Sequence, residues 1–217
     1  MVDATGRGAR VGRLLGAHRV VFDRLVGLGA TFAASDVDDQ RYLLVEAAPV
    51  GWWYSAPAAG DRLVAMLMTD ADLCREARLS TRSAWQGLLS ATGLTSARIG
   101  GAVVAGPRAF PAAGQRLQRE DVDAPWIGIG DAALAVDPIS GSGVVRALRT
   151  AADAAGCILT LLGSDRRDEP LAAYEAARDR ECAAYLAERA AYYGAEQRWA
   201  ADPFWRRRHI DGLAAAG

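Results

Sequence analysis

Lysine is absent from this sequence of 217 residues, and all 25 of its basic side chains are arginine. This absence excludes chemistry that depends on a lysine of this chain, such as Schiff-base formation or phosphate binding by a P-loop lysine. Histidine is nearly absent, since only His18 and His209 occur, and their spacing supports neither a metal site nor a Ser-His-Asp triad. We therefore expect neither a bound metal nor a hydrolytic triad.

Cysteine is also scarce. The three cysteines, Cys74, Cys157 and Cys182, are widely spaced and odd in number, which predicts no disulfide framework and favours a reducing cytoplasm. The most apolar stretch, residues 147–162, contains two charged residues and is too short to cross a bilayer. The net charge of −1 provides no field that attracts nucleic acid or an anionic membrane. Half of the residues are apolar and about a quarter are charged, as in a globular protein.

Hydrophobic patterns predict a mixed α/β (α+β) fold. Strands are expected at 25–34, 41–48, 50–56, 62–69, 98–110 and 115–118, which together form an antiparallel sheet of three or more strands. A helix is expected to begin near Ser80 or Thr81, with Trp85, Leu88 and Leu89 on its apolar face. A short buried strand at 125–131 is typical of a parallel sheet, and two long helices are expected at about 143–162 and 169–199.

The most informative segment is the strand-to-helix connection that begins at Asp131. In a parallel sheet, ligands bind at the carboxyl ends of the strands, where this aspartate is expected. The positive end of the following helix favours an electron-rich group, and Gly141 and Gly143 let a flat ring approach the backbone. A plain strand–turn–helix connection with an acidic cap explains the same residues equally well. From the chemistry of the residues, both interpretations stay open.

The residues from Gly128 to Gly143, GIGDAALAVDPISGSG, resemble the second FAD-binding motif of the p-hydroxybenzoate-hydroxylase-like flavoproteins, in the form of the tryptophan-halogenase-like branch. The resemblance implies that Asp131 bonds the ribityl chain and that Pro138 to Gly143 lies beside the isoalloxazine. Asp3 to Arg7, DATGR, resembles the segment in which these enzymes leave their nucleotide-binding domain close to the cofactor. The cofactor-binding residues expected from these motifs are Thr5, Gly6, Gly130, Asp131, Pro138, Gly141, Ser142 and Gly143.

An aromatic segment, GWWYSAP at 51–57, lies where halogenases carry a W-x-W-x-I-P signature. Tyr54 replaces the second tryptophan and Ala56 replaces the isoleucine, so the resemblance favours hydroxylation over halogenation. Trp52 and Tyr54 share one face of a strand and Trp53 the other, and we interpret Trp52 and Tyr54 as substrate-binding residues. Packing in the core is the alternative for all three, and it is the more frequent role of large aromatic side chains on a sheet.

The C-terminal run at 192–207 resembles FAD-dependent enzymes that hydroxylate a protein tryptophan during maturation of tryptophan-derived quinone cofactors. The resemblance divides the chain into the end of an FAD-binding half (1–15), an antiparallel-sheet substrate domain (16–120), the second FAD-binding motif (121–165) and a C-terminal helical segment (166–217). No G-x-G-x-x-G turn for the ADP part of FAD occurs in the sequence. FAD binding by the chain alone is therefore expected to be weak, with the other half of the site on a preceding segment or a partner chain.

The function implied by the resemblance is an FAD-dependent monooxygenase that receives electrons from NAD(P)H or a flavin reductase and oxidises an aromatic molecule or a protein tryptophan. Halogenation is a second possibility, and a non-catalytic remnant or subunit is a third. No catalytic acid or base is assigned. Arg7 and Arg10 are candidates for FAD phosphate groups or for surface ion pairs, and Asp137 is either a turn cap or a cofactor-side carboxylate. The basic cluster at 206–208 is interpreted as a solvated surface rather than a nucleic-acid contact.

Overall fold

A computed structural model describes the chain except for residues 34–41, 100–102, 120–125, 164–167 and 216–217. By internal contacts the chain divides into two compact units. The first contains residues 1–23 and 113–192, and the second contains residues 24–112 and 193–215.

The first unit contains two small sheets. Strand β1 (Val2–Asp3) pairs in parallel with β9 (Ile127–Gly128), which confirms the expected parallel arrangement of the short buried strand. An antiparallel sheet has the order β10-β8-β2, formed by Leu134–Ala135, Gln115–Gln118 and His18–Val21. Short helical segments connect these strands: η1 (Gly6–Gly8), α1 (Arg10–Leu14), η2 (Gly130–Ala132) and η3 (Pro138–Ser140).

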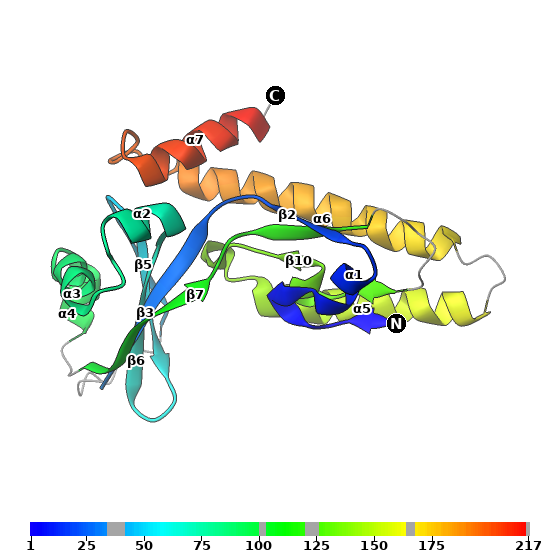
Figure 1. Ribbon diagram of the computed structural model, residues 1–217, viewed down its shortest axis with the longest axis horizontal. Coiled ribbons are helices and arrows are strands. Elements are labelled where there is room, and N and C mark those ends of the chain that lie inside the picture. The colour runs from blue at the N-terminus through cyan, green and yellow to red at the C-terminus, as the bar shows by residue number, and fades with distance from the viewer. Residues whose placement is uncertain (34–41, 100–102, 120–125, 164–167, 216–217) are drawn as a thin grey trace. The chain divides into compact units, whose positions relative to one another are not determined.

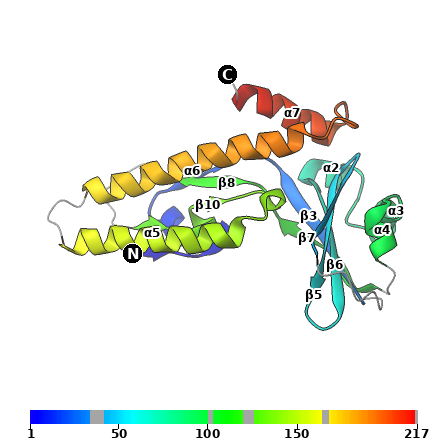
Figure 2. The same ribbon diagram turned by 180° about the vertical axis from the view of Figure 1, so that it is seen from behind.

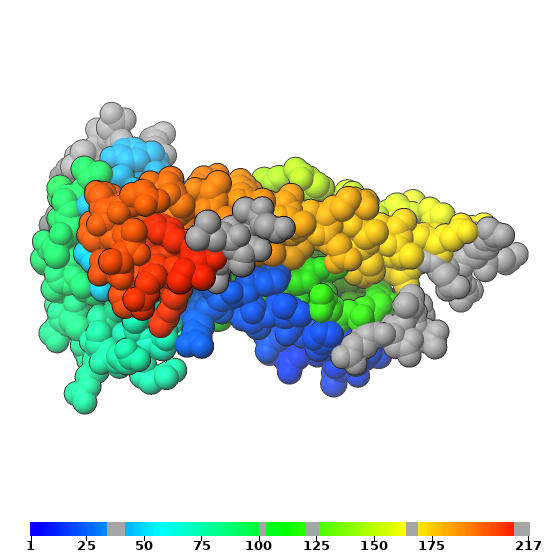
Figure 3. All heavy atoms as spheres, turned by 90° about the horizontal axis from the view of Figure 1, so that it is seen from above, coloured from blue at the N-terminus to red at the C-terminus, as the bar shows by residue number. Residues whose placement is uncertain are grey.

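Two long helices complete this unit. Helix α5 (Gly143–Gly163) and the first-unit part of α6 (Asp168–Gly194) lie side by side in both ribbon views (Figures 1 and 2). They enclose a small core with β9, formed by Ile127, Ala154, Leu171 and Tyr174. Helix α6 also covers the β10-β8-β2 sheet (Figures 1 and 3), where the buried Arg116 of β8 pairs with Glu175 and Asp179 of α6 at 3.2 and 2.7 Å. The antiparallel sheet is therefore held to α6 by charge as well as by packing.

The second unit is built on one antiparallel sheet with the order β4-β5-β6-β3-β7. Its strands are β3 (Leu25–Ala33), β4 (Leu44–Ala48), β5 (Gly51–Ala58), β6 (Arg62–Asp70) and β7 (Val103–Pro111). The expected antiparallel sheet is thus confirmed for five of its six predicted strands, with the glycine-bearing strand β3 in its interior. The prediction was wrong for 115–118, because β8 pairs with β2 and β10 in the sheet of the first unit. A second difference lies at 98–110, where the strand begins at Val103 and Arg98 ends a short helix, α4 (Leu94–Arg98).

One face of this sheet carries the core of the second unit. Trp53, Trp85, Leu28 and Leu67 are buried there together with neighbouring apolar side chains. Helices α3 (Arg82–Ser90) and α4 lie on this side of the sheet (Figures 1 and 2), and α2 (Ala71–Glu76) follows β6. The predicted helix near Thr81 is confirmed, because α3 begins at Arg82 and buries Trp85 and Leu89.

The predicted helix at 169–199 ends early, at Gly194. Glycine has a high entropic cost in a helix and is frequent at helix ends, and here the side-chain amide of Gln197 donates to its carbonyl at 2.6 Å. A separate helix, α7 (Pro203–Ala215), begins at the Asp202–Pro203 pair; it lies in the predicted C-terminal helical segment, but its separate start was not predicted. Proline at the first position of a helix is the local signal for this start.

Within the described residues, no helix is long and apolar enough to cross a membrane. Cys74, Cys157 and Cys182 are unpaired. The described part of the chain also contains no group of three or more His, Cys, Asp or Glu side chains placed to hold a metal ion.

Candidate functional site

The corner predicted from the sequence lies in the first unit, from η2 to the start of α5. The amide of Gly130 donates to the Thr150 hydroxyl at 2.8 Å, and a methyl group on Gly130 would lie 3.2 Å from Cβ of Ala147. Helix α5 therefore passes close behind the turn that carries Asp131. The side chain of Asp131 is about two-fifths exposed (39%), so it is open to a ligand on the outer side of this turn.

The glycines of this corner line open space. A methyl group placed on Gly141, Gly143 or Gly6 would meet no described heavy atom within 4 Å. Gly141 (φ +61°) and Gly6 (φ +65°) also have left-handed backbones that favour glycine. Protein side chains do not fill this corner within the described residues, and a flat group is therefore able to lie against its backbone.

Unused backbone donors border the same space. The first amides of α5, those of Gly143, Val144 and Val145, have no hydrogen-bond acceptor among the described residues, as expected for the first turn of a helix. Helix α5 has 21 residues, so the positive end of its dipole lies at these amides. Val144 and Val145 are 75% and 56% exposed. The corner therefore offers donors and apolar contact surface together.

Asp3 organises the segment opposite this corner. Its buried carboxylate accepts hydrogen bonds from the amides of Thr5 and Gly12, at 2.9 and 2.8 Å, and from the Thr5 hydroxyl at 2.6 Å. Burial alone would raise the pKa of Asp3, but these hydrogen bonds outweigh it and lower the pKa below its ordinary value. The Thr5 hydroxyl also accepts from the Arg10 amide at 2.7 Å. Thr5, predicted as a cofactor contact, thus holds the turn that presents Gly6.

Arg7 connects this segment to the corner. Its guanidinium donates to the carbonyl groups of Ala113 and Val136, at 2.7 and 2.9 Å, and its Nε lies 3.6 Å from Oδ2 of Asp131. The guanidinium is therefore held by the protein itself, whereas Asp131 keeps most of its hydrogen-bonding capacity for another partner. The sequence left two roles open for Arg7, contact with FAD phosphate groups or an ion pair. The structure shows the ion pair, with Asp131.

Asp137 has a structural role. It is fully buried, its Oδ1 accepts from the Ile139 amide at 3.0 Å, and its Oδ2 lies 3.5 Å from Nε of Arg189. Its own amide donates to the hydroxyl of Tyr185 at 2.9 Å, and burial raises the pKa of that tyrosine. These contacts agree with the interpretation of Asp137 as the cap of this turn. The hydroxyls of Ser140 and Ser142 lie 2.8 Å apart and close the turn before Gly143.

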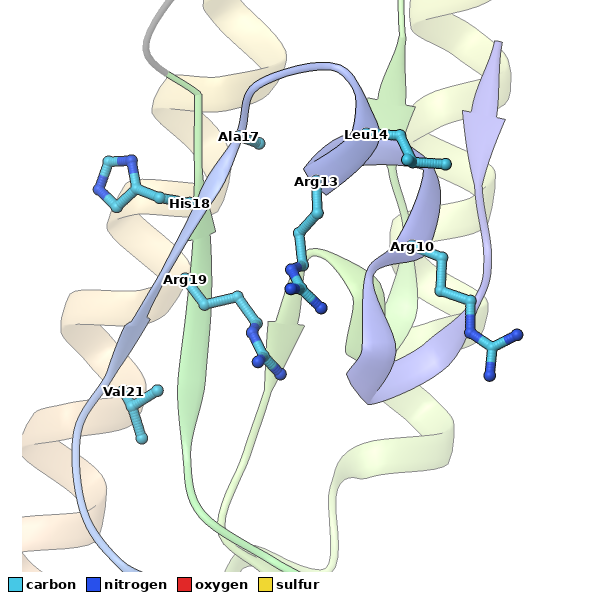
Figure 4. Close-up of a pocket in the computed structure, with 7 residues that line it drawn as sticks. All are labelled: Arg10, Arg13, Leu14, Ala17, His18, Arg19 and Val21. Carbon is cyan, nitrogen blue, oxygen red and sulfur yellow. The ribbon is translucent and has the colours of Figure 1, made fainter.

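Basic side chains of α1 and β2 line an open pocket of about 730 Å³ in the first unit. Arg13 of α1 and Arg19 of β2 point into the same space, whereas Arg10 points away from it (Figure 4). Arg19 reaches the carbonyl of Arg7 and the side chain of Gln115 only at 3.5 Å. No acidic side chain is among the residues that line this surface in the described part of the chain, so it favours anions.

Trp52 and Tyr54 lie in the second unit, on the sheet face opposite Trp53, as predicted from strand alternation. Trp52 is 1% exposed, its Nε1 donates to the Tyr193 hydroxyl at 3.0 Å, and its ring lies 6.1 Å from that of Tyr54. Tyr54 is half-buried, its hydroxyl donates to Sδ of Met66 at 3.4 Å, and burial raises its pKa. Tyr54 is thus the more accessible of the two aromatic side chains.

The same face contains residues that the sequence analysis did not single out. A methyl group on Gly27 would lie 2.5 Å from Sδ of Met66, and one on Gly29 would lie 2.8 Å from Met66 Cε and 3.4 Å from the Phe110 ring. The two glycines of β3 therefore form a trough that the Met66 side chain occupies. Two glycines spaced by two in a strand place two missing side chains on one face, which is the signal that identifies such a trough.

No family model matches the sequence. The chain is 30% identical over 210 residues to the putative FAD-dependent oxidoreductase LodB of Marinomonas mediterranea. The match covers 96% of this chain and 56% of LodB. Among solved structures, the flavin-dependent halogenase CmlS superposes with a TM-score of 0.80 at 24% identity, covering 99% of this chain and 41% of CmlS. The chain has the fold of flavin-dependent oxidoreductases. The chain spans about half the length of LodB, the curated relative that it matches.

A further solved structure is the peptidyl tryptophan dihydroxylase QhpG, described as essential for tryptophylquinone cofactor biogenesis. It is 26% identical with a TM-score of 0.56, covering 87% of this chain and 44% of QhpG. The predicted resemblance and the mixed α/β fold are thus confirmed, and the descriptions of LodB and CmlS as FAD-dependent and flavin-dependent proteins agree with the predicted cofactor. The residue roles expected at the corner and at Trp52 and Tyr54 stay predictions.

Proposed function

We propose that the chain forms the flavin-ring side of an FAD-dependent monooxygenase that acts on an aromatic substrate. The observation that supports this most directly is the open corner at Asp131–Gly143, where glycines leave room for a flat ring and unused amides face the space. A plain strand–turn–helix connection does not require this space to stay open. The similarity to LodB over nearly the whole chain supports the same class of cofactor.

The donors present fit FAD. Asp131 would accept hydrogen bonds from ribityl hydroxyls, and the amides of Gly143 and Val144 would donate to the electron-rich edge of the ring. When bound, FAD supplies the redox chemistry, with electrons from NAD(P)H or a flavin reductase. Because negative charge on the reduced ring is stabilised by nearby donors, the start of α5 would favour the reduced cofactor. Gly6 and Thr5, with Pro138 and Ser142, would shape the surrounding backbone.

These 217 residues contain no G-x-G-x-x-G turn for the ADP part of FAD. The arginine-lined surface in the first unit is an additional place for a phosphate group, and Arg13 and Arg19 are the side chains directed into it (Figure 4). The remainder of the FAD site would be supplied by a further segment or a partner chain. We accordingly expect this part alone to bind flavin weakly.

The proposed substrate is an aromatic molecule or a tryptophan side chain of a protein. In the second unit, Tyr54 and Phe110 lie beside the trough at Gly27 and Gly29, and an aromatic substrate would enter it by displacing the Met66 side chain that occupies it. A peptidyl tryptophan is the substrate named for QhpG, which shares this fold. Trp52 would support Tyr54 from behind through their ring contact.

Halogenation is the second candidate, because the halogenase CmlS superposes over 99% of the chain. The same assay separates the two reactions. The protein, loaded with FAD and supplied with NADH and a flavin reductase, is offered tryptophan and a tryptophan-containing peptide with and without bromide. Monooxygenation adds oxygen to the product regardless of bromide, whereas halogenation requires bromide and adds a halogen. Flavin binding without either product would support the third possibility, a non-catalytic subunit.

A further inference from the structure

A second cavity, of about 560 Å³, lies within the second unit and plays no part in the proposed reaction. It is bounded by the edge strand β4 and the following turn, by the ends of α3 and α4, and by the turn before α7. Its apolar lining includes Val50, Leu88, Ala91, Leu94 and Trp199, with Trp53 at its buried side. This volume is in the range of sites for small organic ligands.

Trp53, one of the residues that line this cavity, has an unused hydrogen-bond donor. Its side chain is fully buried, and its Nε1 has no hydrogen-bond partner among the described residues. The three other buried tryptophans of this unit differ: Nε1 of Trp52, Trp85 and Trp205 donate to Tyr193, Leu28 and Ala48, at 2.9–3.0 Å. Because a buried donor without a partner is unfavourable, the Trp53 N–H is a place where a bound acceptor is stabilising.

Arg198 provides a second donor at the opening of the cavity. Its Nε and Nη2 bind the Glu196 carboxylate at 2.5–3.1 Å, and Nη1 has no acceptor among the described residues. The guanidinium lies 4.3 Å from the centre of the Trp199 ring, which holds both against the cavity wall. An exposed pair such as Arg198–Glu196 contributes little stability and leaves Arg198 free to share its charge with a ligand.

The acidic residue of the lining has no capacity left for a ligand donor. Both carboxylate oxygens of Glu46 accept hydrogen bonds from the amides of Gly93, Leu94 and Thr95 and from the Thr95 hydroxyl, at 2.6–3.1 Å. The cavity therefore combines aromatic and aliphatic walls with two unused side-chain donors, on Trp53 and Arg198. A complementary ligand has a flat apolar body and an acceptor oxygen.

We infer that this cavity, between Trp53 and Arg198, binds a small planar aromatic molecule whose carboxylate or carbonyl oxygen accepts hydrogen bonds from the Trp53 indole and the Arg198 guanidinium. The site is separate from the proposed substrate face, because Trp53 and Trp52 point to opposite faces of β5. The inference does not depend on flavin binding and is testable in its absence.

The test uses the whole ¹⁵N-labelled chain, whose six tryptophans give six indole N–H signals. The Trp53 signal is identified with Trp53→Phe, or from its contacts with Trp85 if that variant does not fold. Three probes are titrated: indole-3-acetate, indole-3-acetamide and 3-methylindole, which has no acceptor oxygen. The expected result is a saturable shift of the Trp53 signal, with 3-methylindole binding about tenfold more weakly because it lacks the hydrogen bond.

Two variants and one control variant make the result specific. Arg198→Gln should weaken indole-3-acetate by about tenfold and indole-3-acetamide less, whereas Arg206→Gln, an exposed position outside the cavity, should change neither. Ala91→Phe fills the cavity from its rim and should abolish the Trp53 shift while the protein stays folded. Equal affinities for all three probes, a Trp53 signal that does not shift, or a shift that survives Ala91→Phe would each overturn the inference.

Discussion

Nε of Arg7 lies 3.6 Å from Oδ2 of Asp131, and the same guanidinium is held by the carbonyl groups of Ala113 and Val136. The pair connects two motifs that are more than 120 residues apart in sequence. The Arg7 side chain is fixed by its hydrogen bonds, whereas the Asp131 carboxylate is partly exposed and can accept further hydrogen bonds. Asp131 is therefore positioned by the protein without being fully used by it.

The first prediction concerns this free capacity. Asp131→Ala should lower flavin affinity at least tenfold, because a charged acceptor for the ribityl hydroxyls is lost. Stability should change by less than about 1 kcal/mol, since Arg7 keeps its two carbonyl partners. Flavin affinity is measured by fluorescence titration and stability by urea unfolding. Asp179→Ala, which removes another exposed partner of an arginine, is the control; unchanged flavin affinity in Asp131→Ala would remove Asp131 from the site.

The second prediction compares two glycines of α5. A side chain on either Gly143 or Gly156 meets no described atom within 4 Å of its first carbon, so leucine should be tolerated at both positions. Gly143→Leu occupies the space proposed for the flavin ring and should reduce flavin binding strongly. Gly156→Leu should leave binding unchanged, and loss of binding in both variants would indicate an effect on the helix rather than on the site.

The sequence predicted the parts of this fold that depend on local patterns. Alternation placed Trp52 and Trp53 on opposite faces, and the buried strand before Asp131 forms the expected parallel pair. It did not predict what depends on distant partners. Tyr193, 141 residues from Trp52 in sequence, accepts a hydrogen bond from the buried Trp52 indole, and the trough at Gly27 is occupied by the Met66 side chain of the neighbouring strand β6. No local pattern specifies these contacts.

The third prediction therefore revises the expectation for Trp52. Because it is fully buried and bonded to Tyr193, Trp52→Ala should lower the free energy of unfolding by about 3–5 kcal/mol. Tyr193→Phe leaves the Trp52 N–H buried without its acceptor and should cost about 1–3 kcal/mol. Tyr192→Phe, at the exposed neighbouring position, should have little effect. Urea unfolding measures all three, and a neutral Tyr193→Phe would show that the bond does not stabilise the unit.

The fourth prediction concerns acid stability of the second unit. Hydrogen bonds from the Arg207 guanidinium, at 2.8–2.9 Å, lower the pKa of Asp72 from 3.8 to about 2. A carboxyl with a depressed pKa in the folded state stabilises the protein above its unfolded pKa, and this contribution disappears as the pH falls from about 4 to 2. After allowance for solvent screening it is about 1 kcal/mol.

Arg207→Gln tests this sign directly. The variant should be less stable than the unmodified protein near neutral pH, and the difference should shrink as the pH approaches about 2. Arg206→Gln on the same helix should show no such convergence. A difference between the unmodified and Arg207→Gln proteins that stays constant over this range would mean that Asp72 does not titrate as proposed.

The central claim is that the corner from Asp131 to Gly143 holds a flavin ring. Backbone amide NMR during a titration with FAD tests this claim and also detects weak flavin binding. The account predicts saturable shifts that centre on the amides of Gly141, Gly143 and Val144 and that weaken in Gly143→Leu. Shifts that are absent at saturating flavin, or that lie elsewhere in the chain and survive Gly143→Leu, would contradict it.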